Sequence, residues 1–564
     1  MTGDLVQVGR RATTLPWGMR PVPETEVVMD APAEPTRGNS ERRNPQRAPL
    51  GREPLLAPSA DVLISHNARV LDPLTAVRVA SQPPIRPTVY VADRLIVSGS
   101  ATDETRAALA EAAKRNGLQV VIDEGAGHQR TAELARRVDL PDQIMLFSTT
   151  VRLVAAGSGP AAPDAWLALQ TFRTLISRDD AGQQQVALDH LLTATPYFHG
   201  SPYFHGSPYF QGSGASFEYG TPGYGGREPV NWLGSAPHRR ADAELRCRRP
   251  VVAVLDTGVG SHPWLPPDIV LRDPSVMGVP IGIHDPLSDP ERTGVIDDPY
   301  EGVLDSDAGH GTFIAGLIRQ VCPDADILAI RVMPSDGAVA ESDLLDALTL
   351  LVIRQSLAQA AGDPRGVIDV VSLSLGYYHE QPDDVSFDPQ LLQPLRALGE
   401  SGVSVVAAVG NDSTARPMFP AAFTPYPGGQ IAAFDTNSVP LVSVGARNPD
   451  NTIALFSNAG PWVSCHRPGA ALVSTFPVTF DAAEQPSYRV DVPGDGMRTT
   501  IDPDNFTSGF GTWSGTSFAA PILAGQLAQC LLDGGCGPLD PPDRASAVSR
   551  GWNAITMQVG VNRP

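Results

Sequence analysis

The stretch VVAVLDTG, residues 251–258, is a near-continuous apolar run that ends on an aspartate and a tight turn. An apolar run without polar alternation predicts a strand buried on both faces, as in a parallel sheet covered by helices. Similar runs follow, and helical patterns that could serve as crossovers lie between them. We therefore predict an α/β fold with a parallel sheet and helices on both faces. The further strand runs lie at residues 325–333, 367–376, 403–410 and 441–446, and the helical patterns at 310–320, 342–362 and 389–402.

A smaller domain is predicted ahead of this sheet, over residues 86–192. Its apolar runs and helical patterns follow the order β-α-β-β-α-β, with one helix ending near Gly117 and another opened by Asp164. This order suggests a small α+β domain of the ferredoxin-like type. The parallel-sheet domain then extends over residues 227–564.

Two segments are expected to lie outside these domains. Residues 1–60 are rich in Pro and Arg and lack apolar periodicity, which predicts a disordered tail. Residues 194–226 form a linker of aromatic, Gly, Ser and Pro residues in which the unit PYFHGS or PYFQGS recurs every six positions. A flexible spacer is the favoured interpretation. The alternatives are partner docking through the regular aromatic side chains and metal binding by His199 and His205.

Composition excludes several classes of function. The formal net charge of -20 disfavours nucleic acid as a partner, because such binding depends on basic patches. Lys114 is the single lysine, and it lies far from every serine motif, so a serine–lysine dyad is discarded. The first thirty residues contain no apolar core of signal-peptide length, and no later run reaches transmembrane length. We expect no membrane partner and a cytoplasmic location.

The five cysteines are an odd and sparse set that does not resemble a secreted disulfide framework. Buried or inert thiols are the default expectation. A local bridge between Cys530 and Cys536 is the alternative.

Three polar residues stand where reactive groups gather in α/β proteins. Asp256 ends the first strand run, and parallel strands present such side chains at their carboxyl ends. His310 lies in GHGT, where a helical pattern begins directly after it. Ser517 lies in SGTSFAAP just before another helical run, so its hydroxyl and N–H face a helix N-terminus that favours a developing oxyanion. Taken singly, each has an ordinary explanation as a turn former, a cap or an N-cap.

The motifs VLDTGV, GHGTFIAG, VVSLSLG, AAVGN and SGTSFAAP together resemble those of the subtilisin-like, or subtilase, serine peptidases, over roughly residues 230–550. Five motifs in the family's order form a far stronger signal than any one of them. The resemblance implies a subtilisin-like fold in which Ser517 is the nucleophile, His310 the general base and Asp256 its orienting carboxylate. It further implies that Asn411 donates its amide to the oxyanion. The strand end Ser374, Leu375 and Gly376 resembles the edge that pairs with substrate backbone.

The chain departs from the family's usual pattern in three places. Phe313 stands where a second histidine is common, and Phe518 follows Ser517 where methionine is common. Both are apolar changes that leave the reacting atoms in place. Residues 284–307 lengthen the interval between Asp256 and His310 and are rich in Asp and Pro, which predicts a surface insertion near the cleft. No metal or other cofactor is predicted, and calcium binding by these carboxylates is the minority alternative, because no EF-hand spacing is present.

The predicted function is therefore a serine endopeptidase that acts on protein or peptide substrates through an acyl-enzyme. The alternative of a catalytically silent scaffold is disfavoured because Asp256, His310, Ser517 and Asn411 are all present. A sedolisin-like acid peptidase relies on carboxylates instead of histidine, and an α/β-hydrolase requires a GxSxG elbow that Ser517 lacks. The domain at 86–192 is similar in outline to a subtilase propeptide, and the rival interpretation is a permanent regulatory or partner-docking domain. A propeptide would be removed by cleavage in the 194–226 linker.

Overall fold

The computed structural model of the chain describes residues 54, 56 and 58–564 except for residues 80–83, 123–130, 132, 135–147, 158–161, 177–184, 195–218, 220–222, 224, 382–389, 535–538 and 541–542. The predicted tail at 1–60 and the repeats of the predicted linker thus fall almost wholly outside the described residues.

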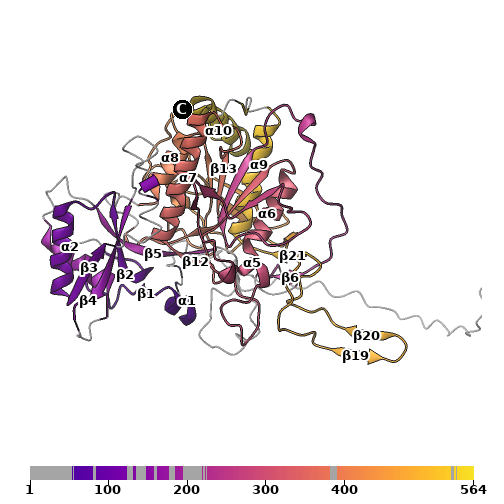
Figure 1. Cartoon of the computed structure of the whole chain (residues 1–564), viewed down its shortest axis with the longest axis horizontal. Helices are drawn as coiled ribbons and strands as arrows, with labels where there is room; N and C mark the ends of the chain where they lie inside the picture. The colour runs from indigo at the N-terminus through magenta and orange to yellow at the C-terminus, as the bar shows by residue number, and fades with distance from the viewer. Residues whose placement is uncertain are drawn as a thin grey trace, which may run out of the picture. The chain divides into compact units, whose positions relative to one another are not determined.

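A parallel sheet of seven strands organises the larger part of the described chain, which confirms the predicted fold class (Figure 1). Each apolar run that was predicted to be a strand supplies one of its strands. Neighbouring strands run parallel, as in the pairing of β7 with β11 and β13. The strand order is β17 (Cys465–Pro468), β16 (Val442–Arg447), β15 (Ser404–Ala408), β13 (Val370–Leu373), β7 (Val251–Asp256), β11 (Asp326–Arg331) and β8 (Val270–Arg272).

Helices cover both faces of this sheet, and the alternation of side chains along β7 shows the two faces. Val252 and Val254 belong to one buried cluster, whereas Ala253 and Leu255 belong to another. The first cluster includes residues of α6 and α9, and the second includes residues of α7 and α8 (Figure 1). The helices are α6 (His310–Val321), α7 (Glu341–Ala361), α8 (Leu392–Glu400), α9 (Thr516–Leu532) and α10 (Arg544–Val559), which packs on α9.

Helix α7 is long and apolar enough to cross a membrane by length and composition alone, the one such helix in the described part of the chain. It is 61% buried within the protein over its most apolar window. Residues of α7 belong to the same buried cluster as residues of the sheet, so α7 packs as a helix of the hydrophobic core.

The amino-terminal part forms an antiparallel sheet with two helices on it. Its strand order is β5-β2-β4-β3, with β1 added beside β2, and α2 packs against α4. This antiparallel order is the one that a β-α-β-β-α-β domain of the ferredoxin-like type has. The Thr102 side chain caps α2 and the Asp164 side chain caps α4, and each accepts a hydrogen bond from a backbone N–H of the first turn. The elements are α1 (Ala60–Ser65), β1 (Ala68–Leu71), β2 (Thr88–Ser98), α2 (Asp103–Arg115), β3 (Leu118–Ile122), β4 (Ser148–Ala155), α4 (Ala165–Leu175) and β5 (Val186–Ala194).

Strand β5 also joins the amino-terminal sheet to two short strands of the larger domain. Beyond β2 it pairs antiparallel with β12 (Ala338–Ala340) and β14 (Leu375–Gly376), which belong to the larger domain (Figure 1). The remaining elements are short and lie around the parallel sheet: β6 (Glu228–Pro229), β9 (Ser275–Val276), β10 (Val279–Pro280), α5 (Pro290–Thr293), β18 (Leu472–Thr475), β19 (Arg489–Val492), β20 (Gly496–Thr499) and β21 (Phe510–Trp513).

Candidate active site

Asp256 and His310 meet at the carboxyl end of the parallel sheet. Asp256 is the last residue of β7, and His310 is the first residue of α6. The His310 Nδ1–H donates to Asp256 Oδ1 at 2.7 Å. Asp256 Oδ1 also accepts the backbone N–H of Thr257 at 2.8 Å. These bonds fix the carboxylate and, through it, the tautomer and direction of the imidazole.

The second ring nitrogen of His310, Nε2, is buried and has no hydrogen-bond partner among the described residues. Burial by itself lowers the pKa of His310, but the charge of Asp256 and the hydrogen bond to it outweigh that effect. Asp307 and Glu291 add to it, and the pKa of His310 is raised above its ordinary value. The carboxylate partner therefore makes the imidazole more basic, and Nε2 is the nitrogen that could act on another group.

Ser517 is the second residue of α9 and is fully buried. Its hydroxyl donates to the carbonyl oxygen of Ser374 at 3.2 Å, and the Ser374 hydroxyl donates to the Ser517 carbonyl at 2.8 Å. The His310 ring lies 5.3 Å, centroid to centroid, from the ring of Phe518, the residue after the serine. The fold therefore joins Asp256 to His310 directly and brings the start of α9 to the imidazole. The Ser517 hydroxyl is turned toward Ser374 and is not hydrogen-bonded to Nε2.

Asn411 follows the strand β15 and also reaches the start of α9. Its side-chain oxygen accepts the backbone N–H of Thr516, next to Ser517, at 3.0 Å. With the oxygen held in this way, the other end of the carboxamide is an N–H donor beside the serine. The two residues of the predicted oxyanion site thus lie next to each other.

The two apolar departures from the family pattern pack against each other. Phe313 of α6 and Phe518 of α9 have ring centroids 4.5 Å apart, and both rings lie near Trp513. His310 is in contact with the same group, since its ring is 5.8 Å from that of Trp513. The aromatic side chains therefore form the apolar wall behind the imidazole, and Phe313 and Phe518 pack within it as neighbours.

Glu291 is a buried carboxyl beside this pair that was not singled out from the sequence. It belongs to α5, inside the Asp- and Pro-rich stretch that was predicted to be a surface insertion. Glu291 Oε1 accepts from the Thr257 hydroxyl at 2.6 Å and from the Gly309 N–H at 3.2 Å, and Oε2 accepts from the Thr312 hydroxyl. The insertion therefore packs into the core at this point, because its carboxyl satisfies donors on both sides of His310.

Other acidic side chains of the insertion accept hydrogen bonds from their own loop. Asp285 accepts from the N–H of Leu287, and Asp298 accepts from the N–H of Tyr300. Asp305 accepts from the N–H of Ile296. These contacts give the carboxylates a role as turn formers.

The predicted substrate-binding residues lie against β5. Leu375 and Gly376 pair with Ala194 and Thr193 of β5, and Ser374 is bonded to Ser517 as described above. On the other side of β5, the N–H of Ala194 donates to the carbonyl oxygen of Gly337 at 2.7 Å. The end of β5 is therefore an extended strand that lies between two segments of the larger domain. One contains Gly337, and the other contains Leu375 and Gly376 and adjoins Ser517 through Ser374.

This arrangement leaves the reactive side chains without access to solvent. The exposed fractions of Asp256, His310 and Ser517 are 1%, 0% and 0%. A carbonyl carbon can reach the Ser517 hydroxyl only if part of the chain that covers it moves away or supplies that carbonyl itself.

Comparison with known proteins identifies the family. The family model described as the subtilase family matches residues 248–532, about half of the chain. The chain belongs to the subtilase family. The matched region contains Asp256, His310, Asn411 and Ser517.

Several curated subtilases are similar to this chain. Serine protease AprX of Bacillus subtilis (strain 168) is 27% identical over 310 residues, which cover 50% of this chain and 56% of AprX. The intracellular serine protease of Paenibacillus polymyxa is 27% identical over 50% of this chain and 67% of its own length. Subtilisin BL of Lederbergia lenta is 28% identical over 40% of this chain and 66% of its own. The chain thus spans little more than half the length of AprX.

Among solved structures, a cold-adapted subtilisin-like serine proteinase aligns with 57% of this chain and 86% of its own, at 18% sequence identity and a TM-score of 0.32. Two predictions fall outside the described residues: metal binding by His199 and His205, and a bridge from Cys530 to Cys536.

Proposed function

We propose that this subtilase is a serine endopeptidase in which Ser517 is the nucleophile, His310 the general base and Asp256 the carboxylate that orients it. The observation that carries the proposal is the 2.7 Å bond from His310 Nδ1 to Asp256 Oδ1, with Nε2 left to act at the start of α9. The substrates are proteins or peptides bound as an extended strand.

The reaction begins when the Ser517 hydroxyl turns from the Ser374 carbonyl toward His310 Nε2. His310 takes the hydroxyl proton as Oγ attacks the scissile carbonyl carbon, and the imidazolium that forms is stabilised by Asp256. His310 then returns the proton to the leaving amine, and the acyl group stays on Oγ. A water molecule, deprotonated by His310, attacks the acyl carbon. The bond from that carbon to Ser517 Oγ breaks, His310 returns the proton to Oγ, and the second product leaves.

The developing negative charge lies on the former carbonyl oxygen. The N–H of Ser517 at the start of α9 and the amide of Asn411 are its donors in this proposal. Support comes from the bond of Asn411 Oδ1 to the N–H of Thr516, which holds the Asn411 side chain at the start of α9. Loss of a donor of this kind in subtilisin, a relative, lowers kcat by about 10²–10³.

The amino-terminal domain acts as the restraint on this site in the same proposal. Strand β5 occupies the place of an extended substrate, because Leu375 and Gly376 pair with it on one side and Gly337 on the other. Cleavage in the 194–226 linker would convert the domain from a tethered to a removable inhibitor. The chain as described here, with its triad buried, is the restrained form.

The test compares the wild type with Ser517→Ala. After limited proteolysis of the linker and removal of the amino-terminal domain, the wild type is expected to react with a fluorophosphonate probe and to hydrolyse casein. Ser517→Ala is expected to do neither, because the probe needs the serine oxygen. Thermal unfolding of both proteins provides the control for folding.

Two results would contradict the proposal. Equal casein hydrolysis by both proteins would mean that another residue is the nucleophile. A folded wild type that has been freed of its amino-terminal domain and neither labels nor hydrolyses would mean that the subtilase fold serves here as a binding scaffold.

A further inference from the structure

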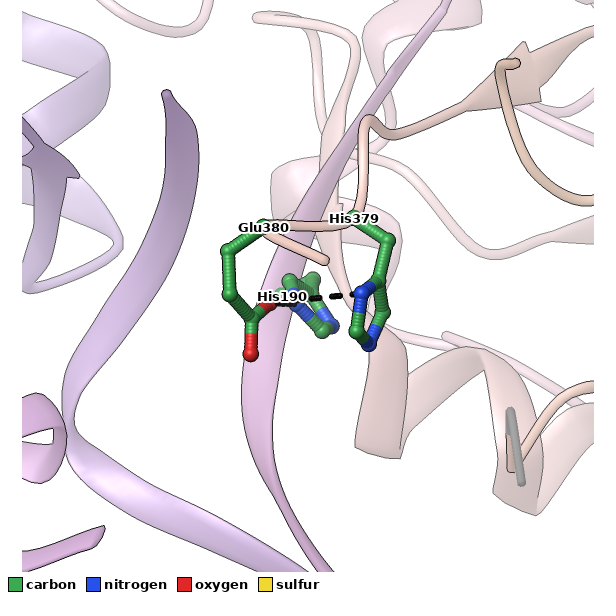
Figure 2. Close-up of side chains that lie close together, drawn as sticks. All are labelled: His190, His379 and Glu380. Carbon is green, nitrogen blue, oxygen red and sulfur yellow. Dashed lines mark hydrogen bonds and ion pairs between the residues drawn. The ribbon is translucent and has the colours of Figure 1, made fainter. Parts of the chain in front are cut away.

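A cluster of buried polar side chains lies where β5 meets the larger domain. His190 comes from β5, whereas His379 and Glu380 come from the segment that follows β14 (Figure 2). Their exposed fractions are 1%, 7% and 1%. Figure 2 shows the three side chains converging from two separate stretches of the chain. Buried groups of this kind are paired or bind a metal ion.

The spacing of the donor atoms fits a small cation. His190 Nε2 lies 2.9 Å from Glu380 Oε2, and His379 Nδ1 lies 3.7 Å from the same oxygen. One donor atom from each of the three residues lies within 4.8 Å of the others. Two donors bound tetrahedrally at about 2.1 Å from a zinc ion stand about 3.4 Å apart. To place all three donors around one ion, the distance from His190 Nε2 to Glu380 Oε2 has to lengthen and the distance from His379 Nδ1 to the same oxygen has to shorten.

Other side chains contact the three candidate ligands in the way that outer-shell residues contact the ligands of a metal ion. His190 Nδ1 is bonded to Glu341 Oε2 of α7 at 2.7 Å, and a histidine that binds a metal through one nitrogen generally donates the other to a carboxylate. Arg173 lies 3.8 Å from the second oxygen of Glu380, and Tyr377 stacks on the His190 ring at 4.4 Å. These groups fix the ring and carboxylate from outside.

Two hydrogen-bonding partners compete with an ion for the donor atoms. The Gln381 N–H donates to His379 Nδ1 at 3.0 Å, so the ion has to displace this amide. A proton between His190 Nε2 and Glu380 has to leave as the ion enters. Metal affinity is expected to fall as pH falls, because the same nitrogen binds either the proton or the ion.

We propose that His190, His379 and Glu380 bind one divalent transition-metal ion of the Zn²⁺ class, with Glu341 as the outer-shell partner of His190. Imidazole and carboxylate are donors that such ions accept. One ligand belongs to β5 and two belong to the larger domain, so the ion ties β5 to the edge that carries Ser374. The proposed metal binding does not depend on the proposed peptidase activity. Only the effect of the metal ion on that activity rests on the proposed function.

The test uses the full chain with Ser517→Ala, which prevents self-cleavage, and with His199→Gln and His205→Gln, which remove the repeat histidines. After chelation and dialysis, the protein is titrated with Zn²⁺ and with Co²⁺ at neutral pH. The expected result is one ion per chain by elemental analysis and a Co²⁺ visible absorption that Zn²⁺ abolishes.

Variants assign the site. His379→Gln removes a ligand and is expected to abolish the absorption, and Glu341→Gln is expected to weaken binding about 10–100-fold without changing the stoichiometry. His238→Gln, at an exposed histidine outside the cluster, is the matched control and is expected to bind as the parent does. If His379→Gln unfolds, the Glu341→Gln titration alone decides the question.

The proposal fails if the parent binds no stoichiometric ion, or if binding is the same in parent, His379→Gln and Glu341→Gln. In the catalytically intact chain, Zn²⁺ is expected to slow fluorophosphonate labelling before linker cleavage and not after removal of the amino-terminal domain. Failure to label under any condition, with stoichiometric metal binding retained, would defeat the peptidase proposal and leave the metal site standing.

Discussion

Glu291 shows how a single buried residue can hold the candidate site together. Its carboxyl receives hydrogen bonds from Thr257, which follows Asp256, and from Gly309 and Thr312, which flank His310. Burial raises its pKa to about 8, although the two threonine hydroxyls act in the opposite direction. Glu291 is a positioning residue in this arrangement, since it acts on the reacting groups through their neighbours.

Replacement of Glu291 by Gln is expected to change the pH dependence of stability. The pKa of Glu291 is higher in the folded than in the unfolded chain, so the folded protein binds the extra proton and loses stability as pH rises from about 4.5 to about 8. Glutamine does not titrate. In a Ser517→Ala background, the Tm of the parent should therefore fall relative to that of Glu291→Gln between pH 5 and pH 8. Parallel Tm curves would mean that the carboxyl is ionised throughout.

Asp256→Asn tests the same region through activity. His310 must be neutral to act as a base, and Asp256 is the charge that raises its pKa. In the processed wild type, the acid limb of kcat/KM should lie above the ordinary histidine value of about 6.5. The Asn variant should lose about 10⁴ in kcat, because the amide no longer selects the tautomer, and its remaining acid limb should shift to lower pH. A variant that keeps wild-type activity and an unshifted limb would remove Asp256 from the assigned role.

At the scale of elements, β5 is the strand on which the proposed restraint of the site depends. It is a member of the amino-terminal sheet and at the same time the third strand between β12 and β14. Its final residue, Ala194, donates its N–H to the Gly337 carbonyl. Main-chain pairing of this kind binds an extended segment with little dependence on its side chains.

Ala194→Pro removes that donor and is expected to weaken the docking of β5. A lost hydrogen bond of about 1 kcal/mol, with the restricted φ of proline added, corresponds to a shift of roughly tenfold or more in the docking equilibrium. The rate of fluorophosphonate labelling of the uncleaved chain should rise by a similar factor. Ala194→Ser keeps the N–H and should label at the wild-type rate. Equal rates for the Pro and Ser variants would mean that the end of β5 does not control access.

At the scale of the whole molecule, the long apolar runs were sufficient to predict five of the seven strands of the parallel sheet and its main helices, whereas the short strands β8 and β17 were not predicted. Each of the predicted strands is buried on both faces, so its sequence is apolar at almost every position and is easily recognised. The short elements α1 and β1, of 6 and 4 residues, carry no such pattern and were not predicted. Glu291 and the His190 cluster were missed for another reason: their partners are 18 to 190 positions away, and spacing in the sequence does not reveal such contacts.

The contacts between the amino-terminal and larger domains are numerous enough to outlast a cut in the linker. Asp189 accepts from the N–H and hydroxyl of Ser342 at the start of α7, at 3.0 and 2.7 Å. The Arg416 guanidinium donates to the Pro87 carbonyl at 2.6 Å, and the Arg86 N–H donates to the Glu380 carbonyl at 2.8 Å. These contacts add to the strand pairing of β5, and none of them passes through the linker.

Cleavage of the 194–226 linker is therefore expected to leave the two domains associated. When Ser517→Ala is nicked by an added protease, the fragments should co-elute in size-exclusion chromatography at micromolar concentration and separate only in denaturant. Burial raises the pKa of Asp189 to about 7, so the comparison is made at pH 8, where the carboxyl is mostly ionised. There the Asp189→Asn variant, which weakens the cap on α7, should dissociate more readily, because hydrogen bonds to a charged acceptor are stronger than those to a neutral one. If the parent fragments separated at once on dilution, the tether rather than the interface would be holding β5 in place, and cutting the linker alone would uncover Ser517.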